Sequence, residues 1–277
     1  METREEETIP AKISVPSLGV AHFSAIDVEP AKFVSLAAAA GFSSIGLRLH
    51  PAFPGAPYYD LPVGSDAARD VKARLNGEGI SLYDIEFVVI GPDFDPVDLA
   101  SMLEAASALG ARRLSVCGDD PDRGRLVAKF AALCDFAATF GMGVDLENMG
   151  WRTVASFDDS LTIVQDSNRD NAGVLIDALH FFRNGGQAND VSSAPPGMIR
   201  SIQLCDARGP APRAADQMVS EARTGRFAPG LGELPVESLM RVLPAGAAVS
   251  VEVPIHSNQT PEEHLRHLND AARALTG

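Results

Sequence analysis

The chain has 277 residues and a formal net charge of −14, from 23 basic and 37 acidic side chains. This balance argues against nucleic acid or an anionic membrane surface as a partner, because no run of Lys or Arg overrides it. Hydrophobic residues make up 45% of the chain and charged residues 22%, so the chain can bury a substantial core without disulfides or a structural metal.

The cysteines and the first residues indicate a cellular setting. Cys117, Cys134 and Cys205 are widely spaced and form no CxxC motif, so we expect reduced, buried thiols in a cytoplasmic protein. The start of the chain is acidic and unlike a signal peptide, and no apolar run reaches membrane-spanning length. We expect residues 1–10 to be flexible and residues 11–277 to form one domain.

Short apolar runs alternate with longer amphipathic segments along the chain. The runs predict strands at residues 13–20, 42–49, 80–90, 112–118, 143–149, 172–179, 199–207 and 248–254. The segments predict helices at 30–40, 65–78, 96–109, 122–140, 157–168, 187–194, 235–243 and 261–275. Repeated strand, helix and strand units imply parallel pairing with right-handed crossovers. The pattern therefore predicts a single closed (β/α)8 TIM barrel.

Two long loops interrupt this alternation, at residues 50–65 and 206–235. Each follows the C-terminal end of a predicted strand, where the active sites of such barrels are built. A long loop can equally be a tolerated surface insertion. Its position at this face favours a functional role.

Polar side chains recur at the ends of the predicted strands. They are Glu86, Glu147, Asp177, Gln203 and Glu252. One such carboxylate can be a structural charge, but several in one barrel mouth repel one another unless a cation gathers them. Hard oxygen ligands favour Mn²⁺ or Mg²⁺, and Zn²⁺ or Co²⁺ is compatible.

Four motifs resemble a known family. They are "GVDLENM" at 143–149, "LIDALHFFRNGG" at 175–186, "IRSIQLCDA" at 199–207 and "VSVEVP" at 249–254. In this order and placement they are similar to the sugar phosphate isomerase/epimerase family of xylose isomerase-like TIM barrels. That group includes keto-sugar epimerases, hydroxypyruvate isomerase and inosose and 3-dehydroshikimate dehydratases, and more distantly endonuclease IV.

The resemblance implies a metal site. It makes Glu147, Asp177 and Glu252 metal ligands, and it places Gln203 where the family usually has a histidine. An amide oxygen can still bind a hard ion, with lower affinity and less preference for softer ions.

The resemblance also implies substrate contacts. His180 matches a position that touches substrate, and Arg223 lies in a loop whose arginine family members aim at the substrate. We expect further contacts from Glu86, Trp151 and Asp206. Alternatives stay open: a packed histidine, a solvated arginine, a structural partner of Arg48 at Glu86, and a rim-covering tryptophan.

These residues favour a metal-dependent isomerase or epimerase acting on a keto-sugar or related polyhydroxy carbonyl compound through an enediolate. Glu147, Glu252 and His180 are the expected catalytic residues. One alternative is a lyase or dehydratase acting on a keto-sugar or keto-cyclitol, in which His180 protonates the leaving oxygen. Another is a non-catalytic polyol-binding barrel, if Gln203 abolishes metal binding. The charge disfavours an endonuclease, and a homodimer stays open.

Overall fold

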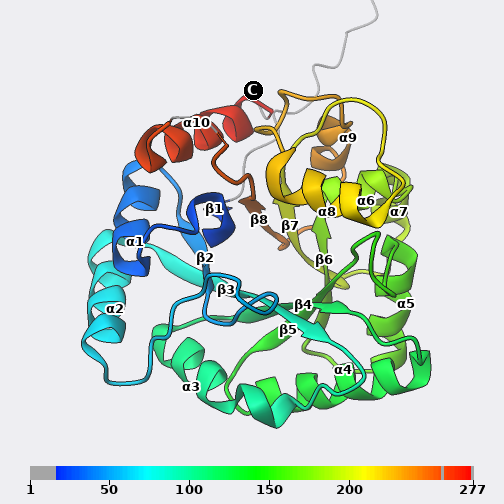
Figure 1. Ribbon diagram of the computed structural model, residues 1–277, viewed down its shortest axis with the longest axis horizontal. Coiled ribbons are helices and arrows are strands. Elements are labelled where there is room, and N and C mark those ends of the chain that lie inside the picture. The colour runs from blue at the N-terminus through cyan, green and yellow to red at the C-terminus, as the bar shows by residue number, and fades with distance from the viewer. Residues whose placement is uncertain (1–16, 257–258, 276–277) are drawn as a thin grey trace, which may run out of the picture.

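The computed structural model describes residues 17–256 and 259–275, and within them eight parallel strands close into a barrel (Figure 1). Each strand pairs with its neighbour in sequence, and β1 pairs with β8. The strands are β1 Leu18–Val20, β2 Ser44–Arg48, β3 Ser81–Ile90, β4 Arg113–Gly118, β5 Gly143–Glu147, β6 Ala172–Asp177, β7 Ile199–Leu204 and β8 Ala248–Val251. The predicted (β/α)8 barrel is confirmed.

Helices surround the barrel (Figure 1). The α-helices are α1 Pro30–Ala39, α2 Asp66–Glu78, α3 Ala100–Leu109, α4 Arg123–Ala138, α5 Phe157–Ser167, α6 Ala178–Arg183, α7 Ala188–Ser193, α8 Ala215–Thr224, α9 Val236–Met240 and α10 Pro261–Ala274. Short 3-10 helices cover His22–Ala25 and Pro96–Leu99. None of the helices in the described part of the chain is long and apolar enough to cross a membrane.

The core lies between the barrel and its helices. All residues of β5 and β6 are buried, as expected for parallel strands that are covered on both faces. Phe33, Phe130 and Phe181 from the surrounding helices are fully buried. The cysteines are free and buried, as the sequence predicts.

Two differences from the predicted elements bear on the site. The predicted strand 172–179 ends at Asp177, because the Asp177 carboxylate accepts the His180 backbone N–H at 3.1 Å and thereby caps α6. The predicted loop 206–235 contains α8, a helix that carries Arg223 in its last turn. The expectations for residues 1–10, and for the first part of strand 13–20, lie outside the described residues.

Candidate active site

A pocket of about 180 Å³ opens at the C-terminal ends of the strands. It is lined by most of the side chains that the sequence singles out: Glu86, Glu147, Trp151, His180, Gln203, Arg223 and Glu252. Asp177 lies beside Gln203 in the pairing of β6 with β7, and it is fully buried. The fold therefore brings the predicted strand-end residues to one barrel mouth.

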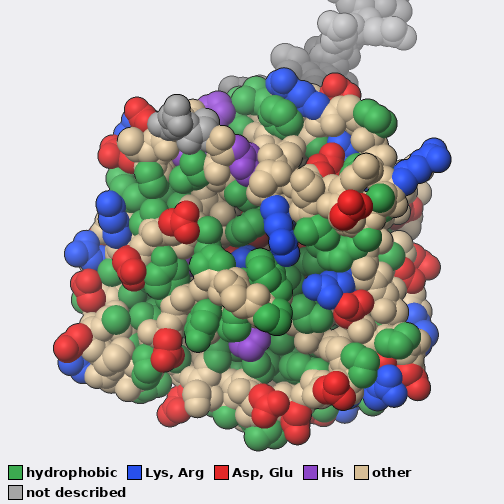
Figure 2. All heavy atoms as spheres, in the orientation of Figure 1, with side chains coloured by type: hydrophobic (Ala, Val, Ile, Leu, Met, Phe, Trp, Pro, Cys, Tyr) green, Lys and Arg blue, Asp and Glu red, His purple; other side chains and the backbone are tan. Residues whose placement is uncertain are grey.

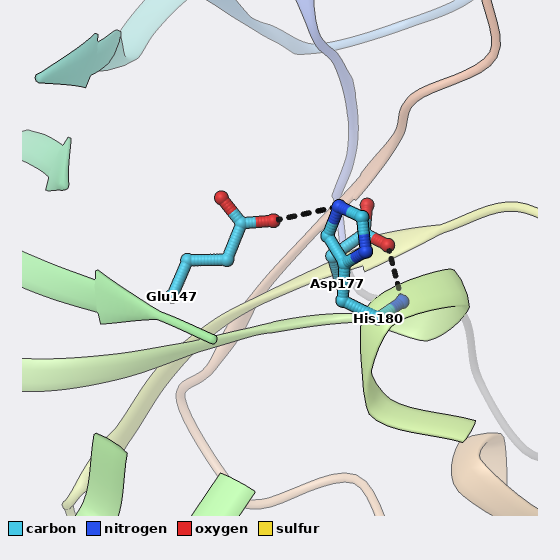
Figure 3. Close-up of side chains that lie close together, drawn as sticks. All are labelled: Glu147, Asp177 and His180. Carbon is cyan, nitrogen blue, oxygen red and sulfur yellow. Dashed lines mark hydrogen bonds and ion pairs between the residues drawn. The ribbon is translucent and has the colours of Figure 1, made fainter. Parts of the chain in front are cut away.

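Glu147, Asp177 and His180 form a compact buried group (Figure 3). One ligand atom from each lies within 4.8 Å of the others. The Nε2 atom of His180 is 3.9 Å from Glu147 Oε1. Two strand ends and the first turn of α6 supply the group, because the Asp177 cap fixes where the helix begins.

Arg226 is the positively charged residue that contacts these acids, and it is almost completely buried. Its guanidinium lies 2.5 Å from Asp177 Oδ2 and 3.3 Å from Glu252 Oε2. Nε donates to the Ala222 carbonyl at 2.9 Å, which fixes the fork toward the two acids. Arg226 belongs to the long loop 206–235 that the sequence places at the mouth, but only the structure shows that it pairs with two of the expected metal ligands.

The acids respond differently to burial. Burial, with the charges of Asp177 and Glu252, raises the pKa of Glu147 well above its usual range. Burial also raises the pKa of Glu252 to about 8, although Arg226 opposes the shift. Burial acts in the same direction on Asp177, but the adjacent Arg226 and His180 lower its pKa overall. Burial lowers the pKa of His180 to about 4, so its imidazole is neutral at neutral pH.

This group fits a divalent cation. The Glu147 carboxylate lines the pocket and accepts no hydrogen bond from any residue that the structure describes. A buried carboxylate without a donor is costly, and a cation removes the cost. Ligands around one ion at about 2.0–2.2 Å stand at most about 4.4 Å apart, close to the spacing found here. Glu252 is held by Arg226 and lies outside the compact group.

Another buried acid, Glu86 on β3, organises the neighbouring part of the pocket wall. Oε1 accepts the His22 N–H at 2.6 Å and Oε2 accepts the Phe23 N–H at 3.2 Å. Arg48 donates to the same carboxylate at 3.4 Å. A Cβ at Gly46 would collide with Glu86, so glycine leaves room for this arrangement. Glu86 is thus the structural partner of Arg48 and also faces the pocket.

Trp151 and Arg223 form part of the pocket wall. The indole meets the His180 ring edge to face with 5.0 Å between centroids. The Arg223 guanidinium lies 4.2 Å from the centroid of the Phe53 ring, so α8 and the 50–65 loop meet there. Both predicted substrate contacts therefore line the pocket.

Asp206 is not among the residues that line the pocket. Its Oδ1 accepts the backbone N–H groups of Ala207 at 2.8 Å and Leu234 at 2.9 Å. Its backbone pairs with Phe227 in an antiparallel bridge. These hydrogen bonds hold the two ends of the 206–235 segment together, so Asp206 stabilises the loop.

Comparison with known proteins places the barrel in a family. The model of the xylose isomerase-like TIM barrel family matches residues 34–274, and the chain belongs to that family. An inosose isomerase from Halalkalibacterium halodurans is 27% identical over 146 residues, which are 50% of this chain and 49% of that protein. The match thus spans about half the length of this relative.

Solved structures agree in fold. The IOLI protein, solved with a bound zinc atom, has a TM-score of 0.76 at 18% identity, over 94% of this chain and 98% of the other. The probable 3-DHS dehydratase AsbF from Bacillus anthracis has a TM-score of 0.74 at 12% identity, over 93% and 99%. At these identities the likeness establishes the fold alone.

Proposed function

We propose that the protein is a divalent-metal-dependent isomerase or epimerase of keto-sugars or related polyhydroxy carbonyl compounds. The observation that carries this proposal is the buried group Glu147, Asp177 and His180 within a pocket at the barrel mouth. The match to an inosose isomerase supports the substrate class. The carboxylate oxygens favour Mn²⁺ or Mg²⁺, and the zinc in the IOLI structure keeps Zn²⁺ as an alternative.

Proton transfer is the task that we assign to the acids of this pocket. A bound divalent ion would stabilise negative charge on a substrate carbonyl oxygen when the neighbouring carbon loses its proton. Glu147 and Glu252 stand at the ends of β5 and β8, so they approach a substrate from different sides. Burial raises the pKa of both carboxyl groups, that of Glu252 to about 8, and a raised pKa suits a carboxyl group that accepts a proton and returns it.

A lyase is the second candidate, and His180 favours it. Its imidazole is neutral, lines the pocket and lies 3.9 Å from Glu147. A neutral imidazole can hold an N–H toward a leaving oxygen after Glu147 has taken the α-proton. Trp151 restricts the ring by its edge-to-face contact.

The test uses the wild-type protein with Mn²⁺ in D₂O and a panel of inososes, D-fructose and D-tagatose. Isomerase chemistry incorporates deuterium next to the carbonyl, and a lyase instead releases water and creates an ultraviolet enone band. Glu147→Gln should abolish either reaction. Glu262→Gln, which changes an exposed acid on α10, should leave it unchanged. Binding of a polyol without either reaction would leave a non-catalytic barrel.

A further inference from the structure

The pocket concentrates positive charge in an acidic protein. Its wall carries Arg48, Arg152, Arg223 and Arg226 against Glu86, Glu147 and Glu252. Over the whole chain, acidic residues outnumber basic ones by 37 to 23. Figure 2 shows Lys and Arg side chains near the centre of the face that lies over the barrel. This reversal of charge raises the question of which negative groups the four arginines bind.

Three of the four arginines have an acidic partner in the protein, and Arg48 shares its partner, Glu86, with two backbone N–H groups. Arg226 pairs with Asp177 and Glu252. Arg152 lies 2.5 Å from the Asp119 carboxylate. A bound divalent ion would add positive charge beside Glu147, so no acid of the pocket wall would be left for Arg223.

Arg48 has donors to spare although it is almost fully buried. Its acidic partner Glu86 already accepts two backbone N–H groups, and the Arg48 contact of 3.4 Å is long. Within residues 17–256 and 259–275, the buried Nε atom of Arg48 has no hydrogen-bond partner. The Phe23 ring lies 4.9 Å from the guanidinium carbon and limits its movement. Arg48 lines the pocket and therefore keeps N–H donors that Glu86 does not use.

Arg223 has no acidic partner among the residues that the structure describes. Its guanidinium stacks on Phe53, which holds the planar group at the pocket wall and leaves its N–H donors uncommitted. Arg48 ends β2, and Phe53 belongs to the loop that follows β2. Both guanidinium groups therefore lie on the β2 side of the mouth. In the closed order of strands β2 is opposite β6, the strand that ends at Asp177.

We propose that the substrate carries an anionic group, a carboxylate or a phosphate, and that Arg48 and Arg223 bind it on the β2 side of the pocket. The planar fork of arginine suits both anions, because each presents two oxygens to it. The anion would then lie across the mouth from Glu147 and Asp177, so the reactive carbonyl faces the acids. This inference rests on the proposed function and narrows its substrate class.

Trp151 provides a binding assay that needs no turnover. It is the chain's one tryptophan and lines the pocket, so its fluorescence should report occupancy. Dissociation constants would be measured for D-fructose, D-fructose 6-phosphate, D-fructuronate and inorganic phosphate. At least one anionic sugar should bind ten times more tightly than D-fructose, and which one does so separates phosphate from carboxylate. If neither binds more tightly, the proposal is overturned.

Arg223→Gln tests the contact itself. Because Arg223 is exposed, the substitution should not disturb folding, so a loss of affinity would reflect the lost contact. The variant should bind the preferred anionic sugar at least fivefold more weakly and D-fructose unchanged. Arg213→Gln, the same charge change in the same segment away from the pocket, should alter either affinity less than twofold. An equal loss in both variants would overturn the proposal. If neutral ketoses exchange deuterium and anionic sugars bind no more tightly, this inference is overturned and the proposed function stands. If anionic sugars bind more tightly but no substrate exchanges deuterium, the proposed function is overturned and this inference stands.

Discussion

The Arg226 guanidinium and the Asp177 carboxylate form a buried ion pair at 2.5 Å. The same guanidinium reaches Glu252 at 3.3 Å, so one arginine pairs with two of the acids that the resemblance assigns to a metal. Glu147 is left to meet a cation with His180 and the remaining electron pairs of Asp177. In the proposed metal-bound protein, Arg226 and the metal would therefore divide the acids of this mouth between them.

Replacing Arg226 should lower the stability of the metal-free protein and increase the stabilisation by metal. Arg226→Gln leaves Asp177 and Glu252 buried without a cation, so the free energy of unfolding without metal should fall by about 3–5 kcal/mol. Mn²⁺ should raise the melting temperature of the variant more than that of the wild type, because it supplies the missing charge. Circular dichroism with and without Mn²⁺ measures both effects. Arg266→Gln, on an exposed pair, is the control, and equal stability of the two variants would contradict the account.

Gln203→His should change which ion the site prefers. Gln203 is buried beside Asp177 in the pairing of β6 with β7 and lines the pocket. Imidazole is a better ligand than an amide oxygen for Zn²⁺, so affinity for Zn²⁺ should rise about tenfold and affinity for Mn²⁺ much less. Competition with a chelating dye measures the ratio. An unchanged ratio would place Gln203 outside the ligand set.

Asp206 should matter for stability rather than catalysis. Asp206→Ala removes the acceptor of two backbone N–H groups and should lower the free energy of unfolding by about 2–3 kcal/mol. Asp206→Asn keeps an acceptor and should cost less. Denaturant unfolding gives the energies, and turnover of the remaining folded protein should stay within twofold. A rise in the Michaelis constant at unchanged stability would instead support the substrate contact expected from the sequence.

His22 should make the protein sensitive to acid. Burial lowers its pKa from 6.5 to about 4, although its 2.9 Å hydrogen bond to the Val28 carbonyl opposes the shift. Between pH 6.5 and pH 4 the unfolded chain binds the proton and the folded chain does not. The free energy of unfolding therefore has its full value above pH 6.5 and decreases as pH falls toward 4. The loss amounts to about 3 kcal/mol.

Urea unfolding of the wild type and His22→Gln at a series of pH values tests this claim. The two curves should converge as pH falls, since the variant lacks the titrating group. Parallel curves would show that His22 is not the source.

The alternation of strands and helices was enough to predict the barrel, because hydrophobic period and turn residues are local properties. The strand-end acids were equally visible, since a parallel barrel gathers all such ends at one face. Two features of the site could not be predicted from these patterns. The apolar run through Leu179 hides the point where Asp177 caps α6. Arg223 and Arg226 stand three residues apart, and only packing decides which one is buried.

Asp206 illustrates the same limit. An acid after a strand looks alike in sequence whether it faces substrate or holds its own backbone. In the structure its Oδ1 accepts from Ala207 and Leu234, and the second of these is distant in the chain. No local pattern encodes that bond.

The measurement that tests the central claim most directly is calorimetric titration of Mn²⁺ into metal-stripped wild type and Glu147→Gln. We expect one ion per chain in the wild type and at least a hundredfold weaker binding in the variant. The metal-free variant should be no less stable than the wild type, because it loses a buried carboxylate whose one partner among the described residues is the neighbouring His180. A wild type that binds no divalent ion, or a variant that binds it as tightly, would contradict the metal site and the reaction built on it.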